Sequence, residues 1–290
     1  MHFLQYINWS PDPIIIDLDF IQLRWYSLLF ALGFIFSYLI LRKRFDKAGL
    51  KEEMLDKLTV YVVLATVIGA RLGHVFFYDW EYYSDHLAEI LLPFRFEPDF
   101  HFVGFQGLAS HGGAIAILIA LIVFAYRHKI NVWWLLDQLG MVIPLAGMCI
   151  RLGNLMNSEI LGKPATVAWA FVFERVDYIP RHPGQLYEAI AYLVIFVALN
   201  LFHKKSTPAT GITFGLFLIL LFSARFLIEF FKTDQSAFEA GMFFNMGQLL
   251  SIPFILLGIV LIVWRNNVKK NGDNKPVMEK NEVKPFSGSL

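Results

Sequence analysis

Seven long apolar runs constrain what this chain can fold into more than any other feature. A helix needs roughly 20 apolar residues to cross the hydrocarbon core of a bilayer. Windows of about that length give candidate spans at residues 24–41, 58–78, 111–126, 132–150, 185–202, 211–231 and 246–264. The third and fourth are short or interrupted by polar residues. The sequence therefore predicts an all-α polytopic membrane protein with about seven transmembrane helices.

Composition agrees with a membrane protein and argues against several classes of function. Hydrophobic residues make up 57% of the chain and charged residues 17%, whereas about a quarter of the residues in soluble domains are charged. A formal net charge of +1 argues against a nucleic acid partner, which requires a basic patch. Because Cys149 is the single cysteine, no intrachain disulfide can form and a zinc site is not expected. The chain shows no metal-ligand spacing, and no cofactor is expected.

The distribution of Lys and Arg predicts the orientation of the chain. Most of the 25 Lys and Arg residues follow the first, third, fifth and seventh apolar runs. Because cytoplasmic loops carry the excess of positive charge, the N-terminus is predicted outside and the C-terminus in the cytoplasm. Residues 1–265 are predicted to form a single membrane domain. The polar tail 266–290 is predicted to be disordered in the cytoplasm.

The predicted outer side holds the longer connections, among them residues 79–110 and 151–184. A β-rich run around Phe171 and Phe173 predicts a small extramembrane hairpin within residues 163–184. Residues 14–23 mix apolar and acidic side chains, which suits an interfacial arm better than a span.

A polar cluster follows the fourth apolar run directly. It contains Arg151, Asn154, Asn157 and Glu159 within nine residues. Such groups at the mouth of a span are costly unless they have polar partners, and guanidinium and amide donors suit an anionic headgroup. The alternative is an Arg–Glu pair that only satisfies a helix end. We favour a functional site near the membrane surface.

Two charged residues lie within the sixth apolar run. Arg225 and Glu229 are four residues apart and therefore share one helical face. Charges at that depth must pair or line a polar cavity. The alternative is an ion pair that only holds helices together. We favour function, because a membrane-embedded arginine binds phosphate well.

His111 opens the third run and is followed by Gly112 and Gly113. The glycines allow close approach of backbone or lipid, and the first amides of a helix favour an anion. His111 could accept a proton near neutral pH. An ordinary interfacial histidine at a helix start explains the motif equally well.

Other polar residues begin or interrupt the spans. Tyr26 also fits an aromatic belt at the membrane surface, and Gln248 also fits a polar residue at a helix start. Arg71 is a candidate partner for lipid or a carboxylate, Asp137 fits a structural role, and Glu188 fits helix capping. Taken together, the residues predict an outward-facing pocket for an anionic lipid with one possible base.

Seven sequence blocks, in order and over most of the chain, resemble the bacterial prolipoprotein diacylglyceryl transferase family. The blocks are Arg24-Trp25-Tyr26, Arg71-Leu-Gly, His111-Gly-Gly, Arg151-x-Gly-Asn-x-x-Asn-x-Glu-x-x-Gly162, Arg181-His-Pro-x-Gln-Leu-Tyr-Glu188, Arg225-x3-Glu229-Phe-Phe and Met246-Gly-Gln-x-Leu-Ser-Ile-Pro253. Five positions depart from the family pattern. At Leu221 some members have a functional Tyr. Ile150 stands in place of the usual Gly, Leu155 of Phe, Gly184 of Ser or Thr, and Lys232 of Arg, and these four suggest packing changes.

The resemblance implies transfer of a diacylglyceryl group from phosphatidylglycerol to the lipobox cysteine of a prolipoprotein in the bacterial cytoplasmic membrane. A thioether forms and glycerol 1-phosphate leaves. The implied roles are phosphate binding by Arg151 and Arg225, orientation by Asn154 and Glu159, and either base catalysis or lipid positioning by His111. The active site is expected on the periplasmic side.

Two other functions are compatible with the residues alone. Intramembrane arginines also line the paths of lipid transporters and flippases, although no internal repeat of the kind common in transporters is evident. A non-catalytic membrane scaffold is the second alternative.

Overall fold

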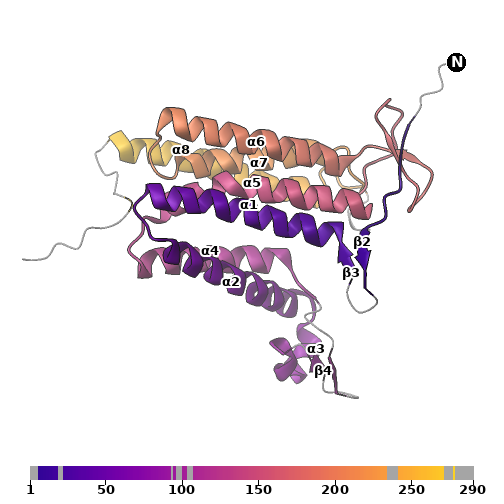
Figure 1. The fold of residues 1–290 in the computed structure, drawn as a ribbon, viewed down its shortest axis with the longest axis horizontal. Coiled ribbons are helices and arrows are strands. Elements are labelled where there is room, and N and C mark those ends of the chain that lie inside the picture. Colours follow the sequence, from indigo (N-terminus) through magenta and orange to yellow (C-terminus); the bar gives the residue numbers. More distant parts are fainter. Residues whose placement is uncertain are drawn as a thin grey trace, which may run out of the picture. The chain divides into compact units, whose positions relative to one another are not determined.

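A computed structural model describes residues 6–18, 22–92, 94–95, 100–102, 107–233, 241–270 and 277. Long helices dominate these residues (Figure 1). They are α1 (Trp25–Lys47), α2 (Glu52–Tyr78), α4 (Ser110–Arg127), α5 (Val132–Asn157), α6 (Gly184–Ser206), α7 (Ile212–Glu229) and α8 (Met246–Lys270). The short helices α3 (Trp80–Asp85) and η1 (Leu87–Ile90) lie between α2 and α4.

The helices confirm the predicted class of an all-α polytopic membrane protein. Within the described part of the chain, six helices are long and apolar enough to cross a membrane, and the apolar stretch His111–Arg127 is shorter. The protein therefore crosses the membrane several times. Each of the seven predicted runs corresponds to one long helix.

Two helices continue beyond the predicted ends of their apolar runs. Helix α5 extends past residue 150 to Asn157, so the connection predicted to begin at 151 begins later. Helix α8 extends past residue 265 to Lys270. Hydropathy windows stop at polar side chains, but a helix continues wherever its backbone hydrogen bonds are kept and those side chains find partners. Apart from residue 277, the predicted tail beyond 270 lies outside the described residues.

The chain divides into two compact units, residues 1–44 with 136–274 and residues 45–135 with 275–290. In the first unit, α5 contacts three other helices. Gly33 of α1 approaches Ala146, Gly140 approaches Phe217 of α7, and Gly147 lies against Tyr192 of α6. Helices α7 and α8 pack along each other, with Phe222 and Phe254 stacked at 4.3 Å between ring centroids. In the second unit, α2 packs along α4.

Asp137 has the structural role that the sequence suggested. Its buried carboxylate accepts hydrogen bonds from the amides of Gly211 and Phe214, both at 2.7 Å. These amides lie at the start of α7, where the first turn of a helix has no internal acceptors for its N–H groups. A side chain of α5 therefore caps α7 and fixes the relative position of the two helices.

Within the ranges that the structure describes, short strands form three small sheets. β1 (Ile7–Trp9) pairs in parallel with β6 (Phe171–Phe173), and β6 pairs in antiparallel with β7 (Pro180–Arg181). The hairpin predicted within residues 163–184 is present, and the pairing of β1 with it was not predicted. β2 (Ile14–Asp17) and β3 (Gln22–Arg24) form a hairpin where an interfacial arm was predicted. β4 (Phe94–Arg95) pairs with β5 (His101–Phe102) in the second unit.

The three-stranded sheet is attached to the end of α5. Leu155, Phe171 and Phe173 form a buried hydrophobic cluster with Trp9 packed against it. The indole N–H of Trp9 donates to the carbonyl of Leu155 at 2.9 Å. These contacts hold the residues that follow α5 next to the start of α6.

Candidate functional site

The centre of the candidate site is the fully buried carboxylate of Glu188, in the second turn of α6. Arg151 of α5 places its Nε 2.8 Å from Glu188 Oε2. Lys232, which follows α7, places its Nζ 3.1 Å from the other oxygen, Oε1. These partners matter, because leaving a buried charge without its partner costs about 3–5 kcal/mol. Three segments distant in sequence therefore meet at one carboxylate.

A second buried carboxylate, that of Glu229, completes this network. Lys232 Nζ lies 3.2 Å from Glu229 Oε2, and Asn245 donates to Glu229 Oε1 at 3.3 Å. Gly247 lies so close that a Cβ added there would come within 2.7 Å of the Glu229 carboxyl carbon. The Lys232 ammonium thus lies between two carboxylates and is itself buried.

Arg225 and Tyr192 join the same group. Arg225 hydrogen-bonds with Tyr192 and interacts electrostatically with Glu188 and Glu229. Tyr192 is buried, donates toward Glu188 Oε1 at 3.5 Å and also hydrogen-bonds with Arg151. The two arginines predicted to bind phosphate are therefore in one cluster. The partners of Glu229 include Lys232 as well as the expected Arg225.

Asn154, Asn157 and Glu159 form an outer layer beside Arg151. Arg151 Nη1 donates to Asn154 Oδ1 at 3.3 Å, and Asn154 Nδ2 donates to Glu159 Oε2 at 3.0 Å. Asn157 Nδ2 donates to the other oxygen of Glu159 at 3.0 Å. The exposed Glu159 turns back toward α5 where the flanking residues 158 and 160 adopt positive φ values of 55° and 57°. Amides rather than arginine thus hold the Glu159 carboxylate.

Tyr26 and Gln248 are also in the first unit. Tyr26 packs against Gly153, where an added Cβ would come within 2.8 Å of its ring. Gln248 and Asn245 form a capping box at the start of α8, because each accepts a hydrogen bond from the backbone N–H of the other. Tyr26 therefore lies beside the turn that carries Arg151, whereas Gln248 positions Asn245, a partner of Glu229.

Arg71 and His111 belong to the second compact unit. Arg71 is buried and donates to the carbonyls of Ile90 and Glu89 and to the hydroxyl of Tyr83. These contacts hold the segment after α2 against that helix. His111 is exposed, with its ring close to the rings of Phe77 and Tyr78. Membership of Arg71 and His111 in the Arg151 site stays a prediction.

Sequence reasoning missed four members of the network: Glu188, Tyr192, Lys232 and Asn245. Glu188 was considered only as a helix cap, and Lys232, which was interpreted only as a packing change in place of Arg, bridges two buried carboxylates. The sequence did contain a signal for Lys232. A lysine three residues after Glu229, at the end of a membrane helix, needs an acidic partner. Tyr192 lies four residues after Glu188 and so shares its face.

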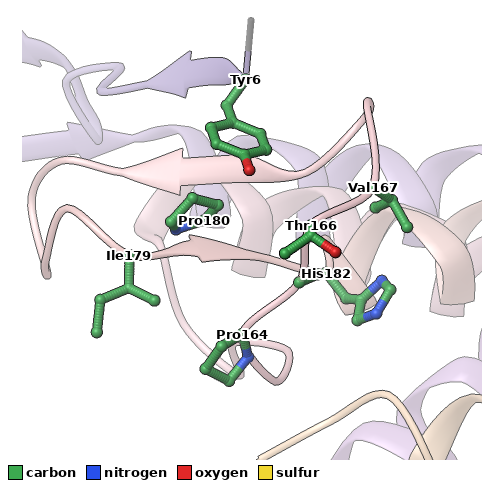
Figure 2. Close-up of a pocket in the computed structure, with 8 residues that line it drawn as sticks. Tyr6, Pro164, Thr166, Val167, Ile179, Pro180 and His182 are labelled. Atoms are coloured by element: carbon green, nitrogen blue, oxygen red, sulfur yellow. The ribbon is translucent and has the colours of Figure 1, made fainter. Parts of the chain in front are cut away.

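A separate hollow lies beside the three-stranded sheet (Figure 2). It has a volume of 520 Å³ and is lined mainly by apolar side chains from the loop 164–167 and from Ile179 and Pro180, with Tyr6 and His182 also at its wall. His182 shares a hydrogen bond with the Tyr187 hydroxyl at 3.0 Å. This hollow contains none of the charged groups of the network.

The network is suited to binding an anion. Arg151, Arg225 and Lys232 supply three positive charges, and the buried Glu188 and Glu229 supply two negative ones. The side chain of Arg151 keeps 15% of its surface accessible whereas Glu188 has none, so a ligand can reach the cation. Among the described residues, no group of three or more His, Cys, Asp or Glu is placed to hold a metal ion.

Comparison with known proteins gives a consistent result. A family model for prolipoprotein diacylglyceryl transferase matches residues 13–264. A phosphatidylglycerol–prolipoprotein diacylglyceryl transferase of Tolumonas auensis is 47% identical over 257 residues, covering 88% of this chain and 96% of that protein. Proteins of the same name from Bacteroides fragilis and Chloroherpeton thalassium are each 43% identical, covering 91% and 89% of this chain and 96% and 93% of their own lengths.

Proposed function

The chain belongs to the prolipoprotein diacylglyceryl transferase family, and on that premise we propose that it carries out the first step of bacterial lipoprotein maturation. Its substrates are phosphatidylglycerol and the lipobox cysteine of a prolipoprotein. This proposal rests on one observation. Arg151 and Arg225 lie together beside the buried carboxylates of Glu188 and Glu229, near helix ends.

The reaction is a displacement at carbon. The cysteine sulfur forms a bond to the carbon of the diacylglyceryl group that carries the phosphate. The bond between that carbon and the phosphate ester oxygen breaks. The electron pair leaves with glycerol 1-phosphate, and the thiol proton passes to a base. The thiol has an ordinary pKa of about 8.5, so a base or cationic surroundings raise the thiolate fraction at neutral pH.

Arg151 and Arg225 bind the phosphate in this mechanism and stabilise the charge that it gains as it leaves. Asn154 supports this role, because it accepts from Arg151 and is itself held by Glu159. Asn157 supports headgroup binding. Its Oδ1 is buried and accepts no hydrogen bond within the described part of the chain, which leaves an acceptor for a hydroxyl of the glycerol headgroup.

His111 is the candidate base, and positioning of the lipid is its other possible role. Its exposed ring is compatible with either. Cys149 is not the nucleophile, because it is buried within α5. Tyr26, Arg71, Gln248 and Glu229 are assigned to the substrate site as the sequence suggested, with Glu229 and Gln248 acting through their contacts to Lys232 and Asn245.

The site is proposed to face the periplasm from the bacterial cytoplasmic membrane. The bias of Lys and Arg toward the connections on the other side supports this orientation. The partners are therefore phosphatidylglycerol from the outer leaflet and lipobox peptides of exported proteins, with no nucleic acid partner.

The test is a transfer assay with purified protein in vesicles that contain labelled phosphatidylglycerol and a lipobox peptide. We expect labelled peptide and glycerol phosphate, and we expect Arg151→Ala to abolish both products while the protein stays in the membrane. Movement of labelled lipid between leaflets without conversion would favour the flippase alternative instead. Unchanged transfer by Arg151→Ala would remove Arg151 from the mechanism.

A further inference from the structure

We propose that Lys232 is a positioning residue that keeps Arg151 and Arg225 available for the phosphate by sharing the two buried carboxylates. This inference rests on the proposed function. Lys232 is not assigned any contact with the substrate. It acts through Glu188 and Glu229, and its positive charge gives the buried network one more cation than it has carboxylates.

The position of Lys232 is fixed on several sides. Its backbone forms an antiparallel bridge with Gly162, and its N–H donates to the carbonyl of Glu229 at 3.2 Å. Its aliphatic stem passes Gly184, where an added Cβ would lie 3.3 Å from Lys232 Cγ. The side chain is therefore directed into the network, where only 3% of the residue is exposed.

The chemistry of the two cation types explains why a lysine is useful there. An ammonium group has three donors around a point charge and can serve two carboxylates at once. A carboxylate with both oxygens free prefers a bidentate contact with a guanidinium group. Lys232 occupies Glu188 Oε1 and Glu229 Oε2, so neither carboxylate offers both oxygens to an arginine, and guanidinium N–H groups remain for phosphate oxygens.

The charge balance leads to the same conclusion. With Lys232 present, three cations face two buried carboxylates, and the single excess positive charge matches the single negative charge of a phosphodiester. Without Lys232 the buried network is neutral. The third carboxylate nearby, Glu159, is exposed and bound by the amides of Asn154 and Asn157, so solvent and amide dipoles already stabilise its charge.

The test measures transfer at increasing mole fractions of phosphatidylglycerol in neutral lipid vesicles. For Lys232→Met, which keeps most of the length of the side chain but removes its charge, we expect the half-saturating mole fraction to rise roughly tenfold or more. Lys232→Arg keeps the positive charge on which the charge balance depends, so its half-saturating mole fraction should stay within about threefold of the unchanged protein. The matched control is Lys163→Met, because Lys163 is the exposed neighbour of Gly162 and lies outside the network.

A charge-compensating variant separates charge balance from a purely structural role. In Lys232→Met with Glu229→Gln, Arg151 and Arg225 face Glu188 alone, so the excess of one positive charge returns. We expect the half-saturating mole fraction of phosphatidylglycerol to fall most of the way from its value in Lys232→Met toward that of the unchanged protein. No recovery in a protein that unfolds at the same temperature as the single variant would overturn the proposal, as would unchanged half-saturation in Lys232→Met.

Two further comparisons cover the cases in which a variant does not fold or the unchanged protein shows no transfer. If Lys232→Met does not fold, the folded Lys232→Arg variant carries the test, and a tenfold or greater rise of its half-saturating mole fraction overturns the proposal. If the unchanged protein gives no labelled peptide, the proposed function itself fails. Transfer by the unchanged protein with no effect at position 232 contradicts only the role of Lys232.

Discussion

Glu188 of α6 holds Arg151 of α5 through an ion pair of 2.8 Å in which the carboxylate is fully buried and the guanidinium keeps part of its surface accessible. Because Glu188 is buried and Arg151 is partly accessible, we infer that the carboxylate positions the guanidinium group. The buried carboxylate fixes the Nε side of Arg151, and Nη1 donates to Asn154, while part of the guanidinium surface stays accessible to a ligand. The pair therefore positions Arg151 as well as stabilising the helices.

Replacing Glu188 by Gln should impair the site without removing its shape. The amide keeps one acceptor but loses the charge that pairs with Arg151 and Lys232, so the buried Lys232 and the partly accessible Arg151 are left with too little compensation. We expect kcat/KM for phosphatidylglycerol to fall about 10- to 100-fold, measured in the vesicle assay. Wild-type kcat/KM in Glu188→Gln would contradict the orienting role.

Replacing Arg151 by Lys tests whether the fork of donors matters or only the charge. A lysine cannot reach Glu188, Asn154 and a phosphate at once, because it lacks the planar set of N–H groups. We expect transfer to fall about 100-fold, in the range typical of the loss of one charge-stabilising donor. Activity within about twofold of the unchanged protein would show that a point charge is sufficient.

Replacing Gly247 by Ala should displace Glu229. The new Cβ would lie 2.7 Å from the carboxyl carbon, so the carboxylate must move away from Lys232 and Asn245. The end of the Glu229 side chain can shift away from the new Cβ, so the main expected effect is reduced transfer through the lost contacts to Lys232 and Asn245.

The matched control for Gly247→Ala is Ile252→Val in the same helix. Ile252 is half-buried, and the change removes one methylene group without adding a contact to Glu229, so transfer should stay normal. Normal transfer in Gly247→Ala as well would show that the position of Glu229 is not critical.

His111→Gln distinguishes a base from a positioning residue. If His111 removes the thiol proton, the rate loss should shrink as the pH rises toward and beyond the ordinary thiol pKa of about 8.5, because thiolate then forms without help. If His111 positions lipid, the loss should be the same at each pH. Transfer rates between about pH 6 and 9.5 at saturating lipid decide between these outcomes.

The ion pair between Asp177 and Arg181, which lies outside the membrane helices, should make the stability of the hairpin depend on pH. Its carboxylate lies 2.6 Å from Arg181 Nη2, and the hydrogen bond from Arg181 holds the pKa of Asp177 below its usual range. The folded hairpin therefore favours the deprotonated form. The stability from this pair is fully present above the unfolded pKa of about 3.9 and is lost as the pH falls through the lower folded pKa.

We expect the loss of this pair to loosen the hairpin only slightly, because ion pairs that stay partly accessible to solvent contribute little. Amide exchange of Ile179 and His182, corrected for intrinsic rates, should show less protection near about pH 2 than near about pH 6 in the unchanged protein. In Asp177→Asn the difference should be smaller. The same pH dependence in both proteins would assign it to other groups.

The helices could be predicted because their cause is local in the sequence. A run of about 20 apolar residues has few alternatives to a membrane helix, and each of the seven runs corresponds to one helix. The ends were less accurate at α5 and α8, since whether a helix continues past Arg151 or Arg265 depends on partners that hydropathy does not include. Arg265, for example, donates to the carbonyl of Thr210, shortly before α7 begins.

The site could be predicted only in part. Arg151, Asn154, Glu159, Arg225 and Glu229 stand out in the sequence because charges and amides near apolar runs are unusual. The membrane fold and the types of group that bind an anion thus follow from the order of residues alone. The meeting of Lys232 and Glu188 between Arg151 and Glu229 became visible only in three dimensions, because ion pairing depends on distances of a few ångströms between segments that lie far apart along the chain.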